Sequence, residues 1–164
     1  MFVHATMPTA ITRYRSPTQG RTMLIQTFDD LLTSARQQPD AQRLLFVFAV
    51  SELPEDATPE QRARFRDGLG GALTPLMEVD RLPDELEDFA QLVSESLEFA
   101  EGTPAENWAI VFCAALGGSG SNPPSREDAD QPLRTMTDSI RMGRISSYIA
   151  FDRMGHQVHL VQAH

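Results

Sequence analysis

Two unbroken apolar runs, residues 44–50 and 109–116, constrain the fold more than any other feature of this sequence. The first reads Leu-Leu-Phe-Val-Phe-Ala-Val and the second Ala-Ile-Val-Phe-Cys-Ala-Ala-Leu. Runs of this length, rich in β-branched and aromatic residues, are typical of strands that are buried on both faces. The runs therefore predict two neighbouring parallel strands lying between layers of helices.

Helix signals alternate with the apolar runs along the chain. Thr27 and Thr58 are placed to cap short helices, and Pro59 suits the first turn of the second one. A longer helix is predicted over residues 83–100. Its apolar face is expected to hold six residues: Leu86, Phe89, Ala90, Val93, Leu97 and Ala100.

The remaining strands complete an α/β pattern. Pro75 cannot donate to a sheet ladder, so its segment is predicted to be an edge strand or to start after it. Residues 145–151 alternate in polarity, and residues 152–155 suit a hairpin turn. The expected fold is a single α/β domain with the order α-β-α-β-α-β-α-β-β. It has a mainly parallel sheet in the order 2-1-3-4-5, covered by helices, with a C-terminal antiparallel β-hairpin at one edge.

Residues 1–22 differ from the rest of the chain. They show no regular period and contain Arg13, Arg15 and Arg21 but no acidic residue. The segment could be a basic binding arm, but it is predicted to be a disordered leader or sequence upstream of a true start at Met23. The expected domain spans residues 23–164.

Composition excludes several classes of function. From Met23 onward, 23 acidic residues oppose 11 basic ones, so this part carries a net charge of −12 and is expected not to bind nucleic acid. The chain contains no lysine, which excludes Schiff-base enzymes and P-loop nucleotidases. It lacks an apolar run of about 18 residues and a signal peptide, so we expect a cytoplasmic protein without a membrane contact.

A glycine-rich loop after the second apolar run is the candidate ligand site. In a parallel sheet, ligands collect beyond the carboxyl ends of the strands, and a helix follows this loop closely. Neither dinucleotide-binding nor P-loop spacing is present, so a plain connection ending in Pro123 and Pro124 is the competing interpretation. The candidate contacts are Gly117, Gly118, Ser119, Gly120, Ser121, Asn122 and Arg126.

Reactive side chains do not form a recognisable group in the sequence. Cys113, the single cysteine, lies inside an apolar run and is predicted to be a buried structural residue. His156 and His159 are spaced so that a strand places them on opposite faces, which argues against a shared metal ion. Ser119 and Ser121 lack the G-x-S-x-G spacing of hydrolase nucleophiles. We therefore assign no catalytic residue, metal or cofactor.

Five short segments resemble a family of short proteobacterial proteins labelled "ribonucleotide reductase subunit alpha". They are residues 28–32, 42–48, 56–62, 108–112 and 151–153, which together span most of the chain after residue 22. The resemblance implies a link to ribonucleotide metabolism. A reductase large subunit uses several cysteines, and the matching segments carry no catalytic motif, so no residue role is transferred.

The sequence leads to two functional hypotheses. The first is a non-catalytic protein-interaction or regulatory module that binds a protein partner or self-associates along its edge strands. The second is a small-molecule-binding or nucleotide-binding protein, or an enzyme, that uses the loop at residues 116–122. The balance favours a protein that is not an enzyme.

Overall fold

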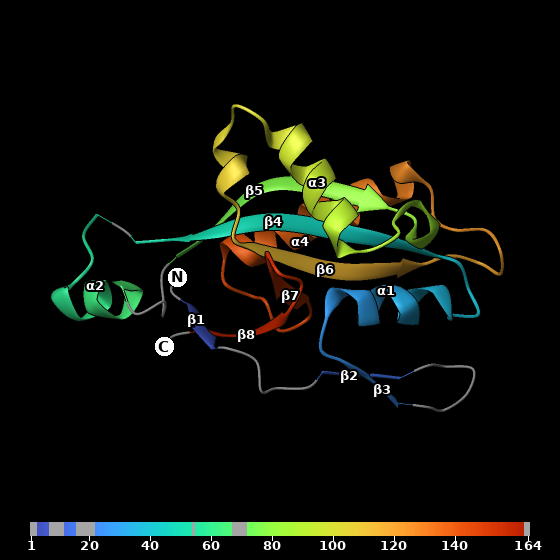
Figure 1. The fold of residues 1–164 in the computed structure, drawn as a ribbon, viewed down its shortest axis with the longest axis horizontal. Coiled ribbons are helices and arrows are strands. Elements are labelled where there is room, and N and C mark those ends of the chain that lie inside the picture. The colour runs from blue at the N-terminus through green and yellow to red at the C-terminus, as the bar shows by residue number, and fades with distance from the viewer. Residues whose placement is uncertain (1–2, 7–11, 16–21, 54, 67–71, 163–164) are drawn as a thin grey trace.

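The structure is a computed structural model that describes residues 3–6, 12–15, 22–53, 55–66 and 72–162. It shows a small single-domain α/β protein (Figure 1). The strands are β1 (Val3–Thr6), β2 (Thr12–Arg15), β3 (Thr22–Ile25), β4 (Gln42–Glu52), β5 (Ala72–Arg81), β6 (Ile110–Gly117), β7 (Ile149–Asp152) and β8 (Gln157–Gln162). The α-helices are α1 (Phe28–Arg36), α2 (Pro59–Arg66), α3 (Phe89–Ala100) and α4 (Arg126–Arg141), with 3₁₀ turns η1 (Pro83–Glu85) and η2 (Pro104–Asn107).

One six-stranded sheet, in the order β1-β8-β7-β6-β4-β5, organises the molecule. β4 and β6 are neighbours, as the two apolar runs predict, and β5 is an edge strand, as Pro75 predicts. From α1 onward, the order of helices and strands along the chain and the order of the five strands across the sheet agree with the prediction. β2 and β3 form a separate two-stranded ribbon.

The predicted strand directions are wrong, because every pair of neighbouring strands in the sheet is antiparallel. An unbroken apolar run indicates that helices cover both faces of the sheet, but it does not distinguish parallel from antiparallel strands. Helix α2 buries no residue, and the segment between β4 and β5 acts as a long hairpin connection. Helix α4 likewise joins two adjacent antiparallel strands, β6 and β7. These two helices therefore interrupt hairpins, whereas α3 links β5 to β6 across β4.

Burial on both faces of β4 divides the core into two layers. Alternate residues Leu44, Phe46 and Phe48 pack with α1 and α3 on one face of the sheet. Leu45, Val47 and Ala49 pack with α4 on the other face. All six are at most 3% exposed, so the run at residues 44–50 is a doubly covered central strand, as predicted.

The predicted helix over residues 83–100 begins later than expected. Residues 83–85 form a 3₁₀ turn, and α3 begins after Asp88, whose carboxylate accepts a hydrogen bond from the Gln91 N–H. Its buried residues are Phe89, Leu92, Ser96 and Ala100, so Phe89 and Ala100 are confirmed. Val93 is partly buried against the same core, whereas Ala90 and Leu97 are exposed. Ser96 is buried because its hydroxyl accepts a 3.0 Å hydrogen bond from the Trp108 indole N–H.

The C-terminal hairpin forms at the predicted turn, but its surroundings differ from the expectation. Gly155 adopts a φ of +81°, the left-handed conformation that favours glycine in tight turns. Residues 145–148 form no strand, so the predicted strand over 145–151 is reduced to β7. Strand β1 pairs with β8, so the hairpin is one strand inside the edge of the sheet.

The prediction of a disordered leader stays a prediction. Within residues 1–22 the structure describes residues 3–6 as β1, residues 12–15 as β2 and Thr22 as the start of β3, and the others lie outside the described residues. None of the helices that the structure describes is long and apolar enough to span a bilayer.

Truncating the central strand tests this architecture. Phe46→Ala removes a ring that is fully buried and lies 5.8 Å from the Phe28 ring, so we expect a loss of about 3–5 kcal/mol in the free energy of unfolding. Urea denaturation measures it. Phe99→Ala, at a ring that is 75% exposed, is the control and should change that free energy by about 0.5 kcal/mol or less. Equal losses in the two variants would contradict the assignment of the core.

Candidate functional site

The glycine-rich loop is a closed turn that is hydrogen-bonded to the residues just before β4. Ser119 and Asn122 exchange two backbone hydrogen bonds of 2.9 Å. The Gly118 N–H donates to the Ala41 carbonyl oxygen at 2.8 Å, and the Gly120 N–H donates to the Asp40 carboxylate at 2.8 Å. These four N–H groups are the donors that an anion would need, and the protein already uses them.

Gly118 is required by packing. A Cβ atom there would overlap the Asn122 carbonyl oxygen and lie 2.9 Å from Pro123 Cα, both of them backbone atoms. Gly120 has a φ of +57°, which glycine adopts without strain. The glycines therefore serve a tight turn.

The structure does not bring the candidate contacts into one cavity. Gly117, Gly118, Ser119 and Asn122 line an open depression beside Asp128, whereas Gly120 and Ser121 face a second one beside α1. Arg126 lines a third depression at the edge of β5. The argument from the carboxyl ends of parallel strands also fails, since β4 starts where β6 ends. Binding by these residues stays a prediction.

The start of α4 is closed by a capping box. The Ser125 hydroxyl accepts a hydrogen bond from the Asp128 N–H at 3.0 Å, and the Asp128 carboxylate accepts one from the Ser125 N–H at 2.9 Å. This backbone N–H, with the Ser125 hydroxyl, holds the pKa of Asp128 below its usual value. A carboxylate thus occupies the helix N-terminus, where a bound phosphate would meet like charge.

Cys113 and the histidines are not assembled for chemistry. Cys113 is 3% exposed, as predicted, and burial raises the pKa of its thiol well above the usual value. His156 and His159 are both exposed, in the hairpin turn and on β8. Within the described part of the chain, no three His, Cys, Asp or Glu side chains are grouped to hold a metal ion.

A groove runs along the free edge of β5, and we call it the β5 groove. It has a volume of about 260 Å³ and lies between α3 and the first turns of α4. Buried Phe48 and Leu92 form its base, and Phe99 on α3 lies at its rim with 75% of its surface exposed. An aromatic ring this exposed beside an unpaired strand edge is suited to contact another polypeptide.

The charged residues of the β5 groove are mostly acidic. Asp80 is bound by Arg43 at 2.6 Å, and Glu95 by Arg81 at 3.3 Å. Glu78 accepts a 2.8 Å hydrogen bond from the Thr137 hydroxyl and, like Asp130, forms no ion pair with any residue that the structure describes. The groove is therefore lined by four carboxylates, Glu78, Asp80, Glu95 and Asp130, and two guanidinium groups, Arg81 and Arg126.

The sequence analysis did not identify Phe99 as a candidate functional residue. Phe99 lay on neither the predicted nor the observed buried face of α3. A usable signal was present, because Glu95, Glu98 and Glu101 lie near this aromatic residue in the sequence. An aromatic residue on the charged face of an amphipathic helix is not used by the core.

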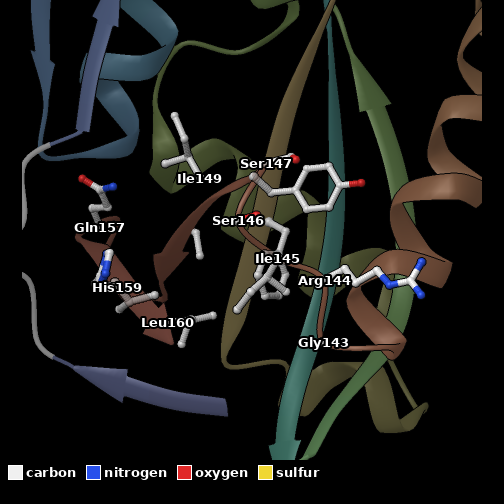
Figure 2. A pocket seen from close by; sticks show the side chains of 13 residues that line it. Gly143, Arg144, Ile145, Ser146, Ser147, Ile149, Gln157, His159 and Leu160 are labelled. Carbon is white, nitrogen blue, oxygen red and sulfur yellow. The ribbon is translucent and has the colours of Figure 1, made fainter. Parts of the chain in front are cut away.

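A wider cavity, of about 610 Å³, opens over β7 and β8 on the face that carries α4. Phe112, Ala150 and Val158 contribute apolar surface, and Ser146 and Ser147 contribute hydroxyl groups. Figure 2 shows Ile145 and Leu160 on either side of the cavity, while Arg144 extends away from it. The cavity is large enough for a small molecule, and its described lining includes Ser146, Ser147 and His159 but no carboxylate.

Comparisons of the chain with models of protein families, with curated proteins and with solved structures found no match. The resemblance to the proteins labelled as ribonucleotide reductase subunits therefore stays a prediction.

Replacing Gly118 tests the structural role of the loop. We expect Gly118→Ala to lower the free energy of unfolding by about 1–3 kcal/mol, since the new methyl group meets fixed backbone atoms. Gly117→Ala is the matched control, because its Cβ would lie 3.4 Å from the flexible Gln42 side chain. Thermal unfolding by circular dichroism measures both variants. A stable Gly118→Ala protein would leave the glycine free for a ligand-related role.

Alkylation tests the burial of Cys113. The raised pKa leaves little thiolate at pH 8, and the strand shields the sulfur from solvent. We expect N-ethylmaleimide to modify the folded protein at least about a hundredfold more slowly than the urea-unfolded protein. Mass spectrometry follows the reaction. Comparable rates in the two states would mean that the thiol is open to chemistry.

Proposed function

We propose that this chain is a non-catalytic, cytoplasmic protein-interaction module and that its contact surface is the β5 groove. One observation carries the proposal: the outer edge of β5 pairs with no strand among the described residues, and the exposed Phe99 ring lies beside it. Open edges offer unpaired backbone groups to another chain, and exposed aromatic rings are common anchors in interfaces.

The distribution of reactive groups supports a binding role over catalysis. The thiol of Cys113 is buried, and the loop donors at Gly118 and Gly120 are engaged within the protein. A reaction needs a nucleophile or a base within reach of a positioning group. Neither the Cys113 thiol nor the loop N–H groups meet this requirement, whereas the β5 groove offers a surface for recognition.

The cavity over β7 and β8 favours a second candidate, the binding of a small apolar molecule. A thermal-shift screen separates the two hypotheses, since a ligand at about 100 times its Kd adds about 2.7 kcal/mol of stability. Under the interaction hypothesis, small molecules leave the melting temperature unchanged and the binding partner is a polypeptide.

Affinity capture from the native cell with variants in the exposed rings tests the proposed function. We expect the wild-type protein to retain a partner chain or a second copy, and Phe99→Asp to lose at least about 90% of it, because the variant removes the exposed ring and places a charge at the rim of the groove. Met154→Asp is the matched control, since Met154 is 77% exposed in the β7–β8 turn. Sizing by light scattering identifies a second copy. If no protein is retained, or if both variants lose it equally, the proposal fails.

A further inference from the structure

We infer that the occupant of the β5 groove is an extended, basic segment of a different protein, which adds to the sheet as a further strand beside β5. The inference rests on the proposed function and specifies its partner. It is carried by the regular part of the strand edge, by the apolar base of the groove and by its charge.

The half of β5 that lines the groove is suited to pair with another strand. A β-bulge interrupts the pairing with β4 between Phe48 and Ala49, and Pro75 lies at that bulge without an N–H to donate. Residues 77–81 follow the bulge in regular register with β4. A strand added here lies between α3 on one side and the start of α4 on the other, the arrangement of strand-addition grooves in which side pockets read alternate residues.

The apolar part of the groove selects the side chains that face α3. Val79 and Phe99 flank an opening whose base is formed by Phe48 and Leu92. Because side chains alternate along a strand, one residue in two of the added segment would face this surface. An apolar side chain there would remove part of the Phe99 ring from water.

The charge of the groove selects the other residues of the added segment, which alternate with those that face α3. The groove is lined by four carboxylates and two guanidinium groups. The Arg43 guanidinium, which binds Asp80, reduces the excess of negative over positive groups by one. Glu98 and Glu101 add negative charge close to Phe99 in the sequence, and the whole chain carries a net charge of −9. A segment with lysine or arginine at alternate positions is complementary to this field, and an acidic segment is repelled.

The same charges argue against a second copy as the occupant. In a two-fold antiparallel pair, residues equally far from the axis face each other. An axis at Glu78, Val79 or Asp80 places carboxylates opposite carboxylates. An axis at Met77 places Pro75 opposite Val79, so the proline and the bulge enter the new ladder.

Labelled peptides with defined charge test the inference on the full-length protein. The probes are strands of about eight residues that alternate valine with lysine, or valine with glutamate, and a lysine peptide with a central proline. We expect the basic peptide to bind at least about tenfold more tightly than the other two by fluorescence anisotropy, with binding weakened at high salt. Hydrogen exchange should show new protection of the amides at residues 77–81.

Variants of the protein locate the site. Phe99→Ala should weaken the basic peptide about tenfold, and Met154→Ala should leave its affinity unchanged. Glu78→Gln with Asp130→Asn should reduce the preference for the basic over the acidic peptide at least about threefold. Glu55→Gln with Glu60→Gln removes the same charge beside and within α2 and should preserve that preference.

The outcomes separate this inference from the proposed function. If Phe99→Asp loses a captured protein but the peptides show no preference for basic charge or extended conformation, the inference fails and the interaction module stands. If light scattering shows a dimer that Phe99→Ala dissociates, the groove belongs to a second copy and the inference also fails. If neither capture nor peptide binding depends on Phe99, both proposals fail.

Discussion

The burial of β4 on both faces is the constraint on which the rest of the molecule depends. A strand with Leu44, Phe46 and Phe48 on one side and Leu45, Val47 and Ala49 on the other needs helices on both sides of the sheet. Helices α1 and α3 cover Leu44, Phe46 and Phe48, and α4 covers the residues on the other face. Because α4 packs mainly against β4 and β5, the helices that the structure describes leave the same face of β7 and β8 partly uncovered, and the wide cavity opens there.

From α1 onward, sequence patterns predicted which segments form strands, which strands are neighbours and where helices begin at strong caps, but they did not predict β1, β2 and β3. Thr27, Thr58 and the turn at Gly155 are local signals, so they did not depend on the rest of the fold. Strand direction was wrong because it depends on where each connecting segment runs, and the sequence of α2 does not record that it buries no residue. The start of α3 was wrong because Asp88 is one of several carboxylates that could cap it, and its buried face was predicted only in part.

The candidate site could be predicted less well than the fold. A loop with three glycines has the same composition whether the glycines admit a ligand or another part of the chain. Here the backbone of Asn122, Pro123 and Ala41 lies close against Gly118, and Ala41 is far from it in the sequence. Phe99 is the opposite case, since it lies outside both the predicted and the observed buried face of α3 and the core pattern therefore does not identify it. A proposed contact surface of this kind consists of apolar side chains that do not pack in the core.

An open sheet edge is also a risk of aggregation, and the features that protect β5 narrow the choice of partner. Pro75 and the adjacent bulge remove one half of the strand from regular pairing. Glu78 and Asp80 place negative charge on the other half, which opposes pairing between copies of this acidic chain. Such protection is selective, because the carboxylates that repel a second copy attract a basic strand. In the proposed interaction, the same few residues oppose pairing with a second copy and select the partner. The carboxylates then keep a second copy away from the exposed Phe99 ring, while a basic strand can approach it.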